Sequence, residues 1–294
     1  MAAPNLVFLL GDPVGHSLSP AFQNAAFQAA GIPWSYRAQR VDGERLDDVL
    51  DALALLGLGG ANITVPHKEG ALGSMDSLDR EASIVGAVNT VCITKDGLRG
   101  SNTDVDGFLA ALGEEVPGGL KRPAVVILGA GGAARAAAWA LVRDGWTEHI
   151  AVVNRTLEKG QVLINTLREG EARKGGGRTR FDLFRESSEL TADLKAGTGL
   201  VVNATPLGQG ALADQTPLEG VEGFPEETFV FDLVYGVRPT PLVRLARAAG
   251  LSAADGKKML LHQGARSFEL WTGQSAPLEV MRDALESAAR SQGR

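Results

Sequence analysis

The stretch Ala124-Val-Val-Ile-Leu-Gly129-Ala-Gly131-Gly132-Ala-Ala134-Arg135 carries the strongest fold signal in this chain. Its first five residues are apolar and mostly β-branched, which predicts a buried strand. The glycines that follow predict a sharp turn into an alanine-rich helix, with Gly131 where the backbone approaches a phosphate. The free N–H groups at the start of that helix, and its positive dipole end, favour a pyrophosphate. The pattern is typical of a dinucleotide-binding βαβ unit.

A second predicted strand, residues 150–153, ends about 20 residues beyond the glycine turn. An NAD site usually places Asp or Glu there, to bond the ribose 2′-hydroxyl. Here the strand leads into Asn154-Arg155-Thr156, and Lys159 follows closely. A guanidinium binds a phosphate well, whereas a carboxylate would repel it. The alternative is that Arg155 and Lys159 are solvated charges opening a surface helix. Together with the glycine turn, however, they predict NADP(H) as the cofactor.

Composition limits the classes of protein to which the chain can belong. Its 294 residues suit two domains, and a net charge of −6 argues against a nucleic-acid or anionic-membrane partner. The single Cys92 excludes an intramolecular disulfide and fits a reducing compartment. We find no zinc-ligand spacing of Cys and His, so no metal site is expected. The N-terminal apolar run is short and lacks basic residues before it, so the protein is expected to be cytoplasmic.

Predicted strands alternate with predicted helices along the chain, which favours α/β layers with parallel strands. A domain boundary is expected near residues 104–120. Ser19 is expected to cap a helix over residues 20–30, and the glycine-rich residues 170–180 to form a flexible loop. Asp96-Gly97 predicts a hairpin turn. Further strands are expected at 6–10, 34–40, 60–65, 200–203 and 229–233, and further helices at 44–56, 103–112, 260–271 and 278–289.

Polar side chains cluster near the ends of two predicted strands of the N-terminal half. Ser17 and Ser19 lie in the loop after the first strand, with the spacing i, i+2. Asn62 and Thr64 share one face of the strand over 60–65, and Lys68 follows Pro66, which ends that strand. Each residue also has an ordinary interpretation, as a helix cap, a loop residue or a solvated charge.

A carboxylate beside Lys68 would hold that amine charged or tune it for proton transfer. Asp104 is a candidate, since it stands where an extended segment turns into a helix. Helix capping is its ordinary role, and Asn89 is equally suited to a turn. The spacing of Lys68 and Asp104 along the chain does not show whether they meet.

The motifs taken together closely resemble the shikimate dehydrogenase family. Each motif alone is weak, but nine in the family's order are specific and span nearly the whole chain. They are PVGHSLSP (13–20), ANITVPHK (61–68), GAVNT (86–90), SNTD (101–104), GAGGAAR (129–135), NRT (154–156), NATPLG (203–208), DLVY (232–235) and MLLHQGARSFELWTG (259–273).

The resemblance implies reversible, NADP-linked reduction of 3-dehydroshikimate to shikimate, by a monomer or homodimer. It implies an α/β substrate domain over 1–104, to which the C-terminal helices of 256–294 return, and a Rossmann-type NADP-binding domain over 105–255. It makes Lys68 and Asp104 the catalytic pair. The substrate residues it implies are Ser17, Ser19, Asn62, Thr64, Asn89, Tyr235 and Gln263. The cofactor residues it implies are Gly129, Ala130, Gly131, Gly132, Ala133, Asn154, Arg155, Thr156, Lys159, Thr205 and Gly256.

The chain departs from the family pattern at three places. Lys258 stands where the family usually has glycine beside the nicotinamide, Gln209 where methionine is frequent, and Gly236 follows Tyr235 in place of the commoner Asn-Pro. Two rival functions stay open. A quinate/shikimate dehydrogenase preferring NAD is disfavoured by Arg155 and Lys159, and a non-catalytic ligand sensor is disfavoured by the proton-transfer pair.

Overall fold

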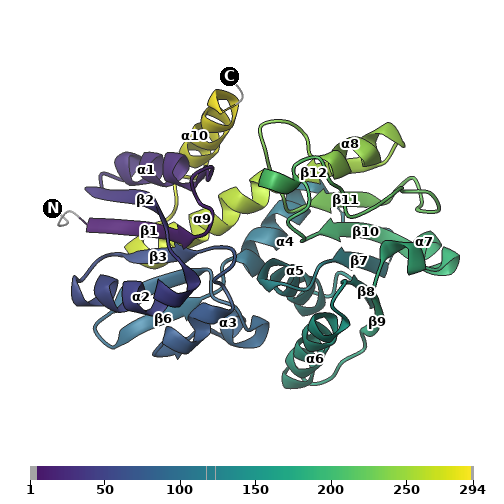
Figure 1. Cartoon of the computed structure of the whole chain (residues 1–294), viewed down its shortest axis with the longest axis horizontal. Helices are drawn as coiled ribbons and strands as arrows, with labels where there is room; N and C mark the ends of the chain where they lie inside the picture. The colour runs from purple at the N-terminus through teal and green to yellow at the C-terminus, as the bar shows by residue number, and fades with distance from the viewer. Residues whose placement is uncertain (1–4, 117, 123, 293–294) are drawn as a thin grey trace. The chain divides into compact units, whose positions relative to one another are not determined.

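The computed structural model describes residues 5–116, 118–122 and 124–292. The chain divides into two compact units, the first formed by residues 1–107 with 260–294 and the second by residues 108–259. The divisions expected from the sequence fall after residues 104 and 255. Both crossings between the units lie inside helices, α4 (Asp104–Glu115) and α9 (Lys257–Thr272) (Figure 1).

The first unit is built on a six-stranded sheet in the order β2-β1-β3-β5-β6-β4. Its first three strands are parallel, whereas β5 pairs antiparallel with both β3 and β6, so the sheet is mixed. Gly97, with φ of 107°, makes the predicted turn of the β5–β6 hairpin. The strands are β1 (Asn5–Gly11), β2 (Trp34–Arg40), β3 (Gly60–Ile63), β4 (Ser77–Leu78), β5 (Thr90–Thr94) and β6 (Gly97–Ser101).

Helices cover this sheet with their apolar faces. α2 (Leu46–Leu55) buries Leu46, Leu50 and Leu53, which helical spacing places on one side. They pack against buried strand residues such as Leu10 and Ile63. α10 (Leu278–Ser291) packs on α1 (Ser19–Ala29), so the C-terminal helix belongs to this unit. The short helix α3 (Arg80–Val85) and most of α9 also belong to this unit.

The second unit has a fully parallel six-stranded sheet in the order β9-β8-β7-β10-β11-β12. This is the strand order of a dinucleotide-binding fold, which confirms the predicted Rossmann-type architecture. The strands are β7 (Ala124–Leu128), β8 (His149–Val153), β9 (Arg180–Phe184), β10 (Thr198–Asn203), β11 (Phe229–Asp232) and β12 (Ser252–Asp255). The helices between them are α5 (Gly132–Arg143), α6 (Leu157–Arg173), α7 (Ala192–Gly197) and α8 (Pro241–Ala248).

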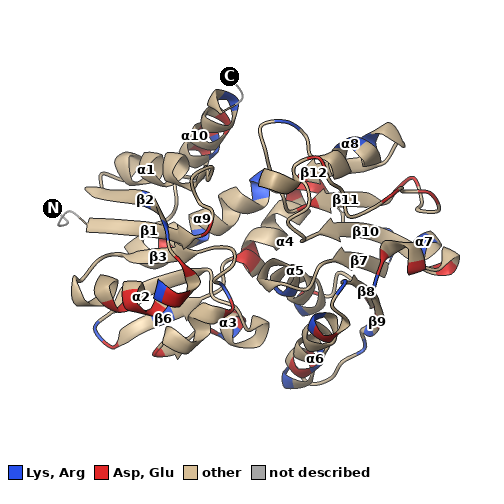
Figure 2. Ribbon diagram, in the orientation of Figure 1, with Lys and Arg blue, Asp and Glu red and all other residues tan. Residues whose placement is uncertain are grey.

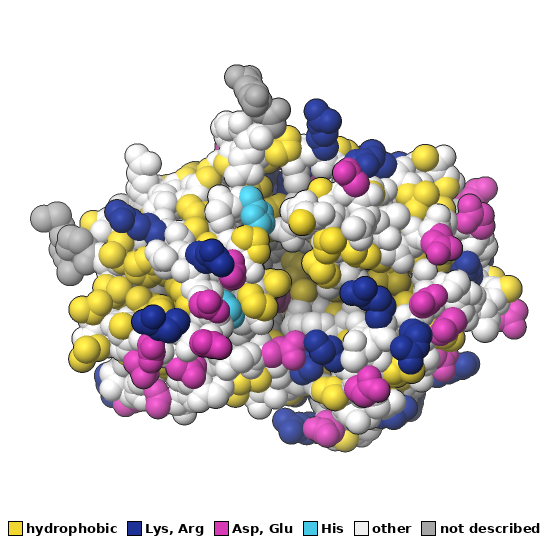
Figure 3. All heavy atoms as spheres, in the orientation of Figure 1, with side chains coloured by type: hydrophobic (Ala, Val, Ile, Leu, Met, Phe, Trp, Pro, Cys, Tyr) yellow, Lys and Arg dark blue, Asp and Glu magenta, His cyan; other side chains and the backbone are white. Residues whose placement is uncertain are grey.

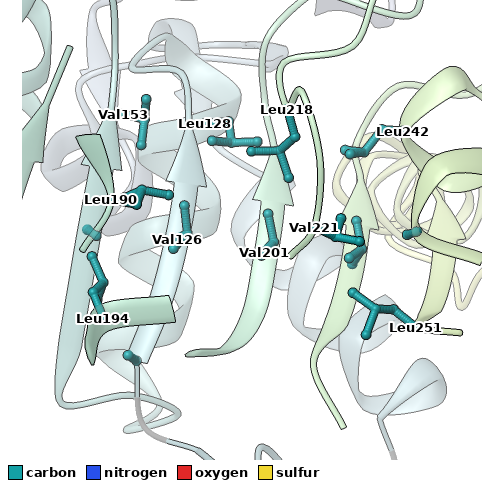
Figure 4. Packing of buried hydrophobic residues seen from close by; sticks show 14 residues of the cluster. Val126, Leu128, Val153, Leu190, Leu194, Val201, Leu218, Val221, Leu242 and Leu251 are labelled. Carbon is teal, nitrogen blue, oxygen red and sulfur yellow. The ribbon is translucent and has the colours of Figure 1, made fainter. Parts of the chain in front are cut away.

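The central strands of this sheet are buried on both faces. All five residues of β7 are buried, as expected for a parallel strand covered by helices on each side. Figure 4 shows Val126, Leu128 and Val201 on one face, packed among Leu194 and Leu218 from the segments that cover it. Each such aliphatic side chain contributes about 1.5–3 kcal/mol on burial, so this core fixes the positions of the strand ends.

Two local expectations are wrong. Ser19 does not cap α1, because the helix begins at Ser19 and follows Leu18; instead Ser17 Oγ accepts from the Ser19 N–H at 3.2 Å. The segment 170–180 is not one flexible loop. α6 continues to Arg173 and β9 begins at Arg180, since the buried Glu171 accepts from the Thr179 hydroxyl at 2.6 Å and ties the two elements together.

Candidate functional site

The first unit brings Lys68 and Asp104 together. Lys68 Nζ donates to Asp104 Oδ2 at 2.6 Å, and the two side chains are only 16% and 4% exposed. Lys68 lies in the turn after β3, and Asp104 is the first residue of α4. A charge-assisted hydrogen bond so sheltered from water is stronger and better oriented than one on the surface.

The turn that carries Lys68 is anchored on both sides. Next to it, the buried ring of His67 contacts Val41 O through Nε2 at 2.8 Å. Lys68 O accepts from the Val88 N–H at 2.8 Å. His67 therefore holds the backbone from which Lys68 reaches Asp104.

Asn89 connects this pair to a second helix. Its Nδ2 donates to Asp104 Oδ1 at 2.9 Å and lies 3.2 Å from Gln263 Oε1 on α9. Its Oδ1 accepts from the Thr103 N–H at 2.7 Å. Asn89 is buried, so its amide orients the catalytic candidates rather than lying in a solvated turn.

Asn62 forms the centre of a buried polar cluster, and its Nδ2 donates to Asn89 O at 3.0 Å. Its Oδ1 accepts from the Tyr36 hydroxyl at 2.8 Å, and its Nδ2 lies 3.0 Å from Thr90 Oγ1 and from Ser267 Oγ. Tyr36, Thr90 and Ser267 are missed by the sequence analysis. Ser267 follows Gln263 by one helical turn, so spacing on α9 offered a signal for it. The substrate contact of Asn62 stays a prediction.

The remaining candidate substrate residues lie apart from this cluster in sequence. Ser17 and Ser19 are joined by a hydrogen bond at the start of α1. Thr64 follows β3, and a Cβ atom at Gly11 would lie 2.4 Å from its methyl group, so the ends of β1 and β3 approach closely. Tyr235 belongs to the second unit, in the loop after β11.

The glycine turn after β7 has the form that a pyrophosphate needs. Gly129 has φ of 109°, and a Cβ atom there would lie 3.0 Å from Ala204 O, so the position requires glycine. Gly131 is the N-cap of α5, and a Cβ atom on it would meet nothing within 4 Å. The helix start is therefore open to a ligand, with no side chain at Gly131 to occupy its N–H groups.

The end of β8 carries the basic residues expected for a 2′-phosphate. Asn154 Nδ2 donates to Thr156 O at 2.6 Å, which shapes the turn into α6. Arg155 and Lys159 are exposed on either side of the helix start. The first turn of α6 carries Lys159 beside the acidic Glu158, and its last turn carries Arg173; blue and red both occur on this helix in Figure 2. No acidic residue stands among residues 153–157 at the end of β8, so the donor set fits NADP(H).

A buried carboxylate links the loops after β10 and β11. Asp232 Oδ1 accepts from Asn203 Nδ2 at 2.8 Å, and Asn203 Oδ1 accepts from the Thr205 hydroxyl at 2.7 Å. Asp232 also accepts from the Val234 N–H at 3.1 Å. Burial raises the pKa of Asp232 to about 6. This residue, which sequence analysis did not select, holds the turns that carry Thr205 and Tyr235.

The structure accommodates Lys258, which stands where the resemblance predicts a glycine, through an ion pair with α4. Lys258 Nζ lies 2.7 Å from Glu115 Oε1 and 3.5 Å from Glu114 Oε2 on α4. Its side chain therefore pairs with α4. Gly256 is needed where it stands, because a Cβ atom would lie 2.2 Å from Leu233 O.

Other kinds of site find little support in the described part of the chain. No group of three or more His, Cys, Asp or Glu residues there is arranged to hold a metal ion. None of the helices described has the length and apolar character that spanning a membrane requires. Burial raises the pKa of the Cys92 thiol to about 11, which disfavours a nucleophilic role. Figure 3 shows Lys and Arg interspersed with Asp and Glu over the visible face.

Three family models match successive parts of the chain. Residues 9–91 match the shikimate dehydrogenase substrate binding domain, residues 125–212 the saccharopine dehydrogenase NADP binding domain, and residues 258–286 the shikimate 5′-dehydrogenase C-terminal domain. The first and last fall in the first structural unit, apart from residues 258–259, and the second falls in the second unit.

Known proteins match over nearly the full length. Shikimate dehydrogenase (NADP(+)) of Methanopyrus kandleri is 43% identical, over 97% of this chain and 96% of that protein. The structure of shikimate 5-dehydrogenase from Thermus thermophilus with NADP(H) and shikimate is 38% identical, with a TM-score of 0.80 and coverage of 97% and 99%. Quinate dehydrogenase from Corynebacterium glutamicum with NAD is 33% identical, with a TM-score of 0.84 and coverage of 97% and 100%. At this level of identity and coverage, the chain belongs to the shikimate dehydrogenase family.

Proposed function

We propose that this protein catalyses the reversible, NADP-linked reduction of 3-dehydroshikimate to shikimate. The observation that carries the proposal is the sheltered Lys68–Asp104 pair, which lies in the unit that matches a shikimate dehydrogenase substrate binding domain. Family membership supports the same activity, since the relative from Methanopyrus kandleri, 43% identical to this chain, is named a shikimate dehydrogenase (NADP(+)).

Lys68 would move the proton in this reaction. Reduction of a ketone builds negative charge on its oxygen, and the bound nicotinamide supplies the hydride. An ammonium group has three donors, and Lys68 uses one toward Asp104. Another can stabilise the oxygen and then protonate it. In the oxidative direction the same amine would take up the hydroxyl proton.

Asp104 would orient both Lys68 and the substrate. Its two oxygens accept from Lys68 and from Asn89, and a carboxylate has capacity for further donors such as a ring hydroxyl. We propose that a set of hydroxyl and amide groups holds the substrate's carboxylate and hydroxyls. These are Ser17, Ser19, Asn62, Thr64, Asn89, Tyr235 and Gln263.

The second unit would hold NADP(H). We propose the glycine turn, residues 129–133, for the pyrophosphate, and Asn154, Arg155, Thr156 and Lys159 for the 2′-phosphate and its ribose. Thr205 and Gly256 would lie near the nicotinamide half. The expected monomer or homodimer, its cytoplasmic location and the lack of a nucleic-acid partner remain predictions.

Quinate oxidation with NAD is the second candidate, because the solved quinate dehydrogenase with NAD is 33% identical to this chain. Purified protein should be given shikimate or quinate, each with NADP⁺ or NAD⁺, and the reduced nicotinamide followed by absorbance. Strong reduction of NADP⁺ with shikimate alone supports the proposal. Comparable reduction of NAD⁺ with quinate would favour the second candidate. Inactivity in all four assays, from protein that still binds NADPH, would favour a ligand sensor.

A further inference from the structure

The carboxyl ends of three neighbouring strands in the second unit are aligned. Leu128 of β7 pairs with Val153 of β8, and Val153 pairs with Phe184 of β9. The residues that follow these ends are therefore Gly129, Asn154 and Arg185. Backbone hydrogen bonds continue the alignment past the strands, from Gly129 N to Val153 O at 2.8 Å and from Asn154 N to Phe184 O at 2.9 Å.

Gly129, Asn154 and Arg185 form a row that runs across the carboxyl ends of β7, β8 and β9. Parallel strands lie about 4.8 Å apart, so each step along the row moves one strand farther from the glycine turn. In this fold the pyrophosphate lies at the glycine turn and the ribose at the end of the adjacent strand. The next position in the same direction, after β9, is Arg185. It lies beside the part of the site proposed for the 2′-phosphate.

The side chain of Arg185 turns back toward β8. Its Nη1 donates to Arg155 O at 3.1 Å, and its backbone N–H donates to Glu189 Oε2 at 2.8 Å. Both Arg155 and Arg185 are exposed. A guanidinium has several N–H donors in a planar fork, and the bond to Arg155 uses one of them. The contact places a second guanidinium next to the backbone that carries Arg155.

The charge of the two loops makes this second cation important. Residues 154–159 and 185–189 contain three basic residues, Arg155, Lys159 and Arg185, and three acidic ones, Glu158, Glu186 and Glu189. Without Arg185, the acidic residues would outnumber the basic ones where a dianionic phosphate has to bind. Carboxylates near the site reduce its attraction for phosphate.

We propose that Arg185 binds the 2′-phosphate of NADP(H) together with Arg155 and Lys159, and that it contributes to the preference for NADP over NAD. The inference rests on the proposed function, from which it takes the position of the cofactor. NAD lacks this phosphate, so the contribution of Arg185 is limited to NADP(H).

Binding of NADPH and NADH to the full-length protein, measured by calorimetry without substrate, tests the inference. R185A should weaken NADPH binding about tenfold, the loss expected for a charge-assisted hydrogen bond, and should leave NADH binding unchanged. R180A is the matched control, because Arg180 lies at the amino end of β9, away from the carboxyl end that Arg185 follows, and pairs with Asp182. It removes the same charge and should change neither affinity.

R155A separates failure of this inference from failure of the proposed phosphate site. If R155A weakens NADPH selectively while R185A behaves like R180A, the role of Arg185 is refuted and the site stands. If neither variant changes the preference, both are refuted. Equal losses of NADPH and NADH in R185A would mean stacking on adenine, which overturns the phosphate assignment. Adenosine 2′,5′-bisphosphate and 5′-AMP, tested in the same way, should repeat the selective loss.

Discussion

Asn89 donates to Asp104 Oδ1 at 2.9 Å, while Lys68 binds the other oxygen of the same carboxylate at 2.6 Å. The carboxylate is thus fixed from two sides, by a strand-end amide and by the amine proposed to transfer the proton. Three segments of the first unit, which carry Lys68, Asn89 and Asp104, meet at this point.

The variant N89A tests this arrangement. It removes the donor to Asp104 Oδ1, so we expect kcat to fall by about 10- to 100-fold, the range for loss of a hydrogen bond to a charged group. N102A is the control, because Asn102 is equally buried nearby but donates to Ala87 O. Both variants should lower the melting temperature, and N102A should retain far more activity. Equal kcat values for the two variants would contradict the positioning role.

Variants of Lys68 and Asp104 should show that the pair contributes to catalysis and, separately, to stability. K68M should lower kcat by about a hundredfold or more, as expected for loss of a general acid. It should also lower the free energy of unfolding by about 3 kcal/mol, because it leaves a buried carboxylate without its partner. The double variant K68M/D104N should recover part of that stability in urea titrations but none of the activity. Unchanged turnover in K68M would refute the mechanism.

The buried Asp232 should make stability depend on pH. Burial raises its pKa from 3.8 to about 6 in the folded protein, with the charge of Asp255 acting in the same direction. The folded state therefore holds this proton more tightly than the unfolded state. The stabilising contribution is fully present below pH 4 and is lost as the pH rises to about 6, by up to about 3 kcal/mol.

D232N has no carboxyl group to titrate at this position. The difference in unfolding free energy between the wild type and D232N should therefore fall as the pH rises from 4 to 7. Urea titrations at each pH measure it. A difference that does not vary with pH would show that Asp232 titrates near its ordinary value.

The ion pair of Lys258 should be weak and independent of the cofactor. Both partners are partly exposed, so K258Q should lower the unfolding free energy by only about 0.5–1 kcal/mol, and less in high salt. A double-mutant cycle with E115Q isolates the pair. If Lys258 serves only this pair, NADPH affinity in K258Q should stay within about twofold, a shift below 0.5 kcal/mol. A larger loss would place Lys258 in the cofactor site.

Elements with a strong local signal could be predicted from the sequence. β7 is a continuous apolar run ended by glycines, and the structure gives it the predicted bounds. The nine motifs also predicted the family that the comparisons confirm. β9 was not predicted. Its sequence, Arg180-Phe-Asp-Leu-Phe184, follows a glycine-rich stretch, and the segment forms a strand by pairing with β8.

The site was harder to predict from the sequence, because it depends on contacts between residues of different elements, which no local sequence pattern indicates. Lys68 and Asp104 lie on different elements, and only the packed sheet brings them within 2.6 Å. Tyr36 was read as one residue of a strand, although its hydroxyl reaches Asn62. Helix capping by Ser19 was predicted from residue preference alone. In the structure Ser19 is the first residue of α1, and its N–H donates to the side chain of Ser17.

The connection between α6 and β9 has a practical consequence. It lies at the amino ends of the strands, while the proposed nucleotide residues follow their carboxyl ends. The Glu171–Thr179 bond closes the connection at its base, and Gly175 and Gly176, both with positive φ, lie inside it. Chain inserted between these glycines would leave the strand register unchanged. A fluorescent label or an affinity peptide could therefore be attached there, away from the carboxyl ends of the strands where the cofactor is proposed to bind.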